Sequence, residues 1–135
     1  PDMAIFKFTK NILKNKKIDL YNFGRNQRDY TYIDDVAKCI KNICNSKKHK
    51  NLNYQILNIG NNKPIKTLKM VKILEKNLNR TAKKKLTDSF KADSFKTAAN
   101  NKLIKKRYGL NVKTPITTGL KNFVYWYKFF FKIKY

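Results

Sequence analysis

Residues 24–35, with the sequence GRNQRDYTYIDD, organise the rest of the chain. The stretch contains two of the chain's four arginines, Arg25 and Arg28, and a short run rich in β-forming residues. It ends in an adjacent acidic pair, Asp34 and Asp35. We expect a helix and a strand to lead into this stretch and the remaining elements to fold back against it.

The residues on either side of the turn at 24–27 predict a β-hairpin. Residues 18–23, IDLYNF, are typical of a strand that ends at Gly24. Residues 29–33, DYTYI, are typical of a second short strand.

Two helices flank this hairpin. Apolar residues close to i, i+3, i+7 and i+8 predict an amphipathic helix over residues 4–15, with Asp2 as its N-cap. A second helix follows Asp34 and Asp35, and one of these carboxylates is placed to cap its first N–H groups. We prefer this structural role to a catalytic one, because no partner acid or metal-binding cluster accompanies the pair.

Strand and helix patterns alternate further along the chain. Residues 54–60, YQILNIG, predict a strand whose nearly continuous apolar end indicates burial on both faces. Thr67 is placed as the N-cap of a helix. The apolar face of that helix is formed by Leu68, Val71, Leu74 and Leu78. Residues 83–86 predict a short strand.

Two more helices complete the predicted elements. One covers residues 101–108 and stops at Gly109, which suits a left-handed C-cap. The other follows Pro115, with Thr117 or Thr118 as its cap. Its apolar, largely aromatic face is predicted to be core and is formed by Leu120, Phe123, Val124, Tyr127 and Phe130. The fold class is therefore α/β, or α+β for the chain in isolation, with few strands and about five helices.

The charge of the chain is extreme, at +24 for 135 residues. Dense lysine favours binding to nucleic acid or to an anionic membrane. Compositional drift is the interpretation we prefer, because the lysines are spread along the whole chain and arginine, the better reader of phosphate and bases, is scarce.

Several classes of protein are disfavoured by composition. No apolar run reaches the roughly 18 residues of a membrane-spanning helix, and the first residues lack the pattern of a signal peptide. We expect a cytoplasmic protein, and the start at Pro1 suggests a truncated frame or an excised piece. Cys39 and Cys44 fall on different faces of one helix, and His49 stands apart, so we expect reduced thiols and no metal site.

The chain resembles the C-terminal portion of the extended short-chain dehydrogenase/reductases that act on nucleotide sugars. The match is nearest to the UDP-glucuronate 4-epimerase group. It is carried in order by PDMAIFKFTKNILKNKKIDLYNFG, RDYTYIDDV, YQILNIGNNKPI and TPITTGLKNFVYWYKFFF. Residues 87–100 diverge most, since only Asp93, Thr97 and Ala99 match the family's loop there.

The resemblance implies an NAD-dependent isomerase with a Rossmann-type fold. In that family a Gly-rich turn binds NAD, and a Tyr-x-x-x-Lys pair acts in hydride and proton transfer. This chain has glycine only at positions 24, 60, 109 and 119 and has no Tyr-x-x-x-Lys. We therefore expect residues 1–135 to form a single C-terminal substrate-binding region without catalytic residues, with the N-terminal NAD-binding part absent.

Three residues are implied as substrate-binding by their positions in the family pattern. Arg28 matches the arginine that grips the UDP phosphates, which suits a guanidinium fork. Tyr21 matches the position beside the uracil, and Asp93 matches the loop acid that bonds the ribose or uracil. The structural alternatives are Arg28 paired with Asp29 or Asp34, Tyr21 in the core, and a solvated Asp93.

Three functions remain open at this point. The first is the UDP-sugar-binding portion of an epimerase that acts through a transient 4-keto sugar, usually homodimeric, with no specific nucleic-acid partner and no membrane partner. The second is a small basic nucleic-acid-binding protein, which is disfavoured because the aromatic residues fall largely on predicted buried faces. The third is a non-functional remnant of a truncated gene.

Overall fold

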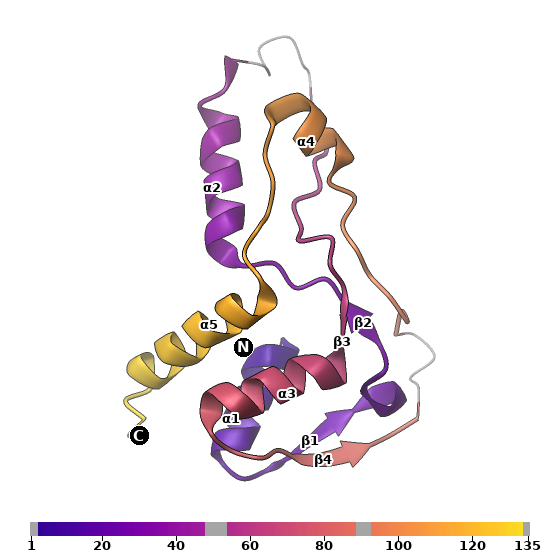
Figure 1. Ribbon diagram of the computed structural model, residues 1–135, viewed down its shortest axis with the longest axis vertical. Helices are drawn as coiled ribbons and strands as arrows, with labels where there is room; N and C mark the ends of the chain where they lie inside the picture. The colour runs from indigo at the N-terminus through magenta and orange to yellow at the C-terminus, as the bar shows by residue number, and fades with distance from the viewer. Residues whose placement is uncertain (1–2, 48–53, 89–92, 134–135) are drawn as a thin grey trace.

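The computed structural model describes residues 3–47, 54–88 and 93–133 (Figure 1). Its elements are, in order, α1 (Ala4–Leu13), β1 (Lys17–Leu20), the 3-10 helix η1 (Tyr21–Gly24), β2 (Gln27–Arg28), α2 (Ile33–Cys44), β3 (Ile65–Lys66), α3 (Thr67–Leu78), β4 (Lys83–Leu86), α4 (Lys102–Tyr108) and α5 (Ile116–Phe130). The described residues thus form five α-helices and few strands, which confirms the predicted mixture of helix and strand.

The strands pair with partners distant in sequence. β1 runs parallel to β4, in a register from Lys17 opposite Lys83 to Leu20 opposite Leu86. β2 runs antiparallel to β3, with Arg28 opposite Ile65. The predicted hairpin between residues 18–23 and 29–33 is therefore wrong. Each of the two strands that flank the central turn is paired by a segment that comes later in the chain.

The first strand ends earlier than predicted because the backbone turns at η1. Asn22 and Phe23 have positive φ values of 49° and 53°, which end extended structure. Their N–H groups donate to the carbonyls of Asp88 and Thr87, so the turn is held by the chain just after β4. The predicted strand at 18–23 is correct only as far as Leu20.

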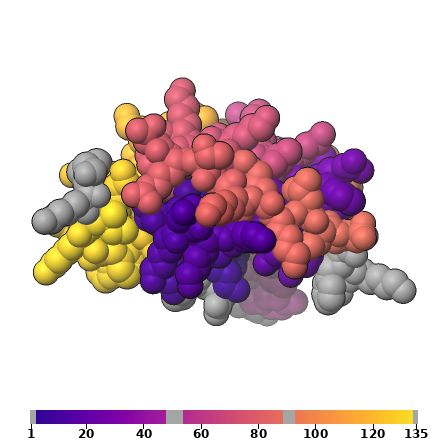
Figure 2. Space-filling view, turned by 90° about the horizontal axis from the view of Figure 1, so that it is seen from below, coloured from indigo at the N-terminus to yellow at the C-terminus, as the bar shows by residue number. Residues whose placement is uncertain are grey.

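The core forms around α3, whose buried face is formed by Met70, Val71, Leu74 and Leu78. α1, β1 and α5 contribute Ile12, Ile18, Leu20, Leu120 and Val124 to the same cluster. The apolar periodicity of residues 67–78 thus predicted the buried face correctly at three of its four positions, and Leu68 packs at the edge. Figure 2 views the molecule from the end that holds β1 and β4 in Figure 1.

Three predicted N-caps have other roles. Thr67 is the first residue of α3, and its hydroxyl donates to the carbonyl of Asn26. α2 begins at Ile33 after Tyr32, so its two aspartates lie inside the first turn, where they complement the helix dipole without capping. α5 begins directly after Pro115, before Thr117 and Thr118. Asp2 lies outside the described residues.

Residues 54–60 are extended but are in no strand of the described chain. Ile56 keeps 77% of its surface exposed, and Tyr54 is exposed as well, so the predicted burial on both faces is wrong. Figure 1 shows this segment running between β3 and the end of the molecule that holds α2 and α4.

The helix predicted at residues 101–108 is confirmed as α4, and Gly109 caps it with φ of 69°. In α5, Leu120, Val124 and Tyr127 are buried as predicted, but Phe130 points outward and is 62% exposed. Cys39 is buried and Cys44 exposed, both as free thiols, which confirms their different faces. None of the helices in the described part of the chain has the length and hydrophobicity that crossing a bilayer requires.

Candidate functional site

The structure brings Arg28 and Asp93 together although 65 residues separate them in sequence. Nη2 of Arg28 donates to Oδ1 of Asp93, and the two groups form an ion pair. Nη1 of Arg28 donates to the carbonyl of Gln27 at 2.8 Å, which orients the guanidinium. The pair is partly open to solvent, with side-chain exposures of 26% for Arg28 and 37% for Asp93.

Two asparagines extend this cluster toward η1. Nδ2 of Asn26 donates to Oδ2 of Asp93 at 2.7 Å, so both oxygens of that carboxylate are engaged. Nδ2 of Asn22 in turn donates to Oδ1 of Asn26 at 2.7 Å. We call Asn22, Asn26, Arg28 and Asp93 the Arg28 cluster. Sequence reasoning missed the asparagines, because asparagine is common throughout this chain and nothing in the pattern marks these two.

The backbone of β2 holds the cluster by pairing on both sides. Gln27 N donates to the carbonyl of Phe95 at 2.8 Å, and Thr97 N donates to the carbonyl of Gln27 at 3.1 Å. On the other side, Thr67 N donates to the carbonyl of Asn26 at 2.9 Å. The loop that carries Asp93 is therefore docked beside β2, which explains how an acid far along the chain reaches Arg28.

Asp29, one of the two alternative partners considered for Arg28, has other contacts. The carboxylate of Asp29 accepts bonds from the backbone N–H groups of Asn62, Lys63 and Ala99 at 2.9, 3.3 and 3.0 Å. Arg28 is thus paired with neither of its two predicted acidic neighbours but with Asp93, which is not a freely solvated acid either.

Tyr21 lies in η1 at 53% exposure, so its alternative placement in the core is wrong. Its position beside Asn22 puts it at the η1 end of the Arg28 cluster. Tyr30 follows Arg28 by two residues, and burial raises the pKa of Tyr30 although the Thr67 hydroxyl and the charge of Arg28 act in the opposite direction. Tyr30 therefore remains a neutral phenol at working pH.

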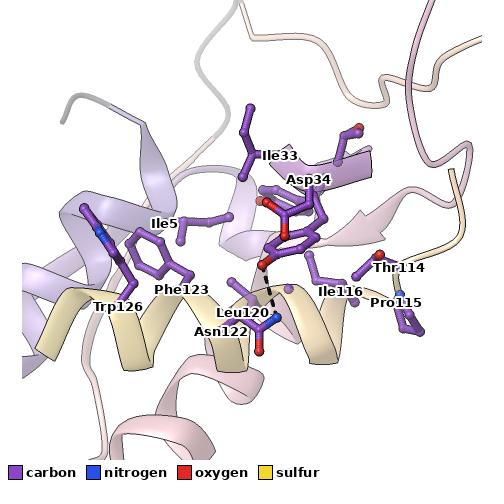
Figure 3. Close-up of a pocket in the computed structure, with 14 residues that line it drawn as sticks. Ile5, Ile33, Asp34, Thr114, Pro115, Ile116, Leu120, Asn122, Phe123 and Trp126 are labelled. Carbon is purple, nitrogen blue, oxygen red and sulfur yellow. Dashed lines mark hydrogen bonds between the residues drawn. The ribbon is translucent and has the colours of Figure 1, made fainter. Parts of the chain in front are cut away.

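A second feature is an apolar cavity of about 510 Å³ between α1, the start of α2 and α5 (Figure 3). Figure 3 shows Ile5, Phe123 and Trp126 toward one end of it and Thr114, Pro115 and Ile116 toward the other. Asn122 Nδ2 donates to the hydroxyl of Tyr32 at 3.1 Å across it. Sequence reasoning did not identify this cavity, because its walls come from segments that lie far apart along the chain.

The cavity's rim is held by Asp35. This carboxylate accepts bonds from the N–H groups of Thr114 at 2.8 Å and Lys113 at 3.1 Å. Burial acts to raise the pKa of Asp35, but the bonds from Thr114 and Lys113 and the nearby charge of Lys38 outweigh it and lower that pKa below 3.8. Asp35 is therefore an ionised structural anchor.

Metal-binding side chains do not gather at either feature. Among the described residues no group of three or more His, Cys, Asp or Glu side chains is arranged to hold a metal ion. What the Arg28 cluster offers chemically is a guanidinium with donors for phosphate and a carboxylate that accepts from hydroxyl or imide groups.

A model of the NAD dependent epimerase/dehydratase family matches residues 1–60. The chain is 42% identical over 127 residues to an uncharacterized protein of Methanocaldococcus jannaschii. This alignment covers 94% of this chain and 38% of that protein. It is 39% identical over 141 residues to UDP-glucuronate 4-epimerase 1 of Arabidopsis thaliana, covering 94% of this chain and 33% of the relative.

A solved structure agrees with these relatives. The crystal structure of the UDP-glucuronic acid 4-epimerase from Bacillus cereus, in complex with UDP-glucuronic acid and NAD, superposes with a TM-score of 0.82 at 25% identity. The match covers 94% of this chain and 41% of that chain. The chain therefore spans about a third to two fifths of the length of these proteins. On these likenesses the chain belongs to the NAD-dependent epimerase/dehydratase family.

Proposed function

We propose that this chain is the UDP-sugar-binding portion of an enzyme like UDP-glucuronate 4-epimerase. That enzyme inverts C4 of the sugar through a transient 4-keto intermediate, and this chain alone does not carry out the reaction. The relatives support the reaction class, and the Bacillus cereus complex supports a UDP-sugar as ligand. The observation that carries the proposal is the contact of Arg28 with Asp93, because two residues implied as ligand-binding by sequence meet in space.

In this proposal Arg28 binds the diphosphate. Its guanidinium keeps its charge at any working pH and presents paired N–H donors to phosphate oxygens. Asp93 balances that charge without ligand and accepts a bond from a ribose or uracil group when the ligand is bound. Asn26 holds the carboxylate of Asp93 in place. Tyr21, exposed beside the cluster, offers its ring to the base.

NAD would bind to residues outside this chain. A dinucleotide site needs a Gly-rich turn between a strand and a helix. Gly24 ends η1, Gly60 lies in the extended segment, Gly109 ends α4, and Gly119 lies within α5. None of the four stands at such a turn, so the residues of this chain do not fit the cofactor. We accordingly assign no catalytic residue here and expect the complete enzyme to be a cytoplasmic homodimer.

Binding of UDP tests the proposal directly. We would measure thermal unfolding of the chain with and without UDP at about 0.15 M salt, which screens non-specific attraction to the basic surface. UDP at a hundredfold excess over its dissociation constant is expected to stabilise the folded chain by about 2.7 kcal/mol. The gain should disappear in Arg28→Ala.

Arg80→Ala is the matched control, because it removes one guanidinium charge at the opposite end of α3. Arg80 donates to the carbonyl of Leu13 and takes no part in the Arg28 cluster. The control should retain the UDP effect. If both variants lost the stabilisation by UDP equally, the effect would come from the net charge of the chain and not from the Arg28 cluster. A folded chain whose melting temperature does not respond to UDP would contradict the proposal.

A further inference from the structure

The last two turns of α5 carry aromatic side chains that are exposed to solvent, although one of them, Trp126, also borders the cavity. Tyr125, Trp126, Phe129 and Phe130 are exposed by 67, 45, 78 and 62% respectively. We call these four residues the aromatic face. Soluble proteins rarely leave a contiguous apolar patch of this kind without a partner. Of the aromatic residues of this helix that were predicted to be core, Tyr127 is buried, but Phe130 belongs to the exposed face.

Helix geometry makes the four residues one surface. Residues four apart lie on the same side of a helix, which aligns Tyr125 with Phe129 and Trp126 with Phe130. The rings of Trp126 and Phe130 stack with centroids 5.4 Å apart and planes 25° apart. Figure 1 shows α5 reaching outward to the C-terminal end, clear of the β1 and β4 layer.

Lysines border the aromatic face on one side. At about 100° per residue, Lys121 and Lys128 lie within about 100° of Phe129 around the helix, on the flank nearer Tyr125. Lys132 follows Phe131, the C-cap of the helix. No aspartate or glutamate follows Asp93 in the sequence. The residues after Asp93 carry ten basic side chains, at positions 96, 102, 105, 106, 107, 113, 121, 128, 132 and 134.

We propose that the aromatic face docks onto an anionic phospholipid surface. Aromatic rings beside lysines are the combination that settles at the level of lipid headgroups, where the rings enter the interface and the ammonium groups meet lipid phosphates. The helix would lie along the membrane surface. The inference departs from the prediction of no membrane partner and does not depend on the UDP-sugar assignment.

The observations favour lipid over the other occupants. A second copy would bring the same lysines against this face, where like charges would oppose one another. Single-stranded nucleic acid stacks its bases on free ring faces, whereas Trp126 and Phe130 already stack on each other. α5 also contains no arginine to read phosphate bidentately.

Trp126 is the chain's only tryptophan and reports the contact directly. We would mix the chain with vesicles of phosphatidylcholine alone or of phosphatidylcholine with phosphatidylglycerol. Binding would be measured by co-flotation and by tryptophan emission, with brominated lipids as quenchers. We expect binding only to the anionic vesicles, a blue shift of Trp126 emission and quenching by brominated chains. These readouts need no variant.

Variants separate insertion from simple charge attraction. Tyr125→Ser combined with Phe129→Ser should weaken vesicle binding about tenfold or more, because two inserting rings are lost. Tyr54→Ser removes an equally exposed aromatic residue elsewhere and should leave binding unchanged. Lys121→Glu combined with Lys132→Glu should weaken binding to anionic vesicles most at low salt.

Three outcomes would overturn the proposal. The first is absence of vesicle binding. The second is binding without any change in Trp126 emission or quenching, which would reflect the overall charge alone. The third is a different occupant of the aromatic face. Either the chain forms a dimer that buries Trp126 and that Phe129→Ser dissociates, or single-stranded DNA binds over Trp126 and displaces the vesicles.

Discussion

A single carboxylate, that of Asp29, joins three segments beside the Arg28 cluster. It accepts backbone N–H bonds from Asn62, Lys63 and Ala99. Asp29→Ala leaves these donors without their acceptor and should lower the free energy of unfolding by about 3 kcal/mol, at the upper end for bonds to a charged group. Urea unfolding checks this. Asp19→Ala, at an exposed position of β1, is the control for the lost charge, and an equal cost there would refute the role of Asp29.

Asp35 should make stability depend on pH. Its pKa is lowered in the folded chain, so its contribution is fully present above the ordinary value of 3.8 and is lost as pH falls through the folded value. Asp35→Asn should therefore cost about 1 kcal/mol near pH 7, and this cost should shrink progressively as the pH falls below 3.8. Unfolding by urea across this range gives the result. A cost that stays constant with pH would contradict the assignment.

The candidate site shows which residues a sequence can reveal. Arg28 and Asp93 were identified through the resemblance to nucleotide-sugar enzymes, and their contact could not be derived from spacing, since 65 residues lie between them. Asn26 and Asp29 were missed as site residues. Their importance comes from backbone groups of distant segments, and those become neighbours only after β2 has paired with β3 and with the 93–97 loop.

At the scale of elements, the turn at η1 ends β1 and brings Gly24 close to the first turn of α3. Gly24 has φ of 71°, and a Cβ there would lie 3.1 Å from Cβ of Leu68, in the first turn of α3. Gly24→Ala should therefore destabilise the chain by about 2–3 kcal/mol, from backbone strain together with the contact. Thermal or urea unfolding measures the difference.

Gly109 provides a close control for that substitution. Its φ is 69°, but a Cβ added there meets no atom within 4 Å. Gly109→Ala should thus cost only the strain of the left-handed backbone, about 1 kcal/mol. Equal losses at the two glycines would show that the approach of Leu68 contributes nothing to the turn.

Helices were predictable and strand pairing was not, for a physical reason. The apolar periodicity of α1 and α3 is a local property that the sequence displays directly. The partners of β1 and β2 are β4 and β3, so each pairing depends on contacts between segments distant in the sequence. A strand followed by a turn and another β-prone run favours a hairpin locally, and tertiary pairing overrode that preference.

For the whole molecule, the extended segment 54–60 leaves the large apolar side chains of Tyr54 and Ile56 exposed. Ile56 is 77% exposed there, and exposed apolar side chains favour association with other chains. The chain spans about a third to two fifths of the length of the relatives it matches. We expect the chain alone to bind the dye ANS and to self-associate, with an associated fraction that rises with protein concentration.

The segment's two faces allow a sharp test of that expectation. Ile56→Lys should reduce ANS binding and self-association while leaving the melting temperature nearly unchanged, because its side chain already faces solvent. Leu57→Lys places a charge on the half-buried face and should lower the melting temperature by several degrees, since an unpaired charge is then desolvated. Light scattering and thermal unfolding of both variants give the answer. If Ile56→Lys unfolds the chain as Leu57→Lys does, the outward face is packed in solution. The segment would then already be paired, most simply with a second copy of itself.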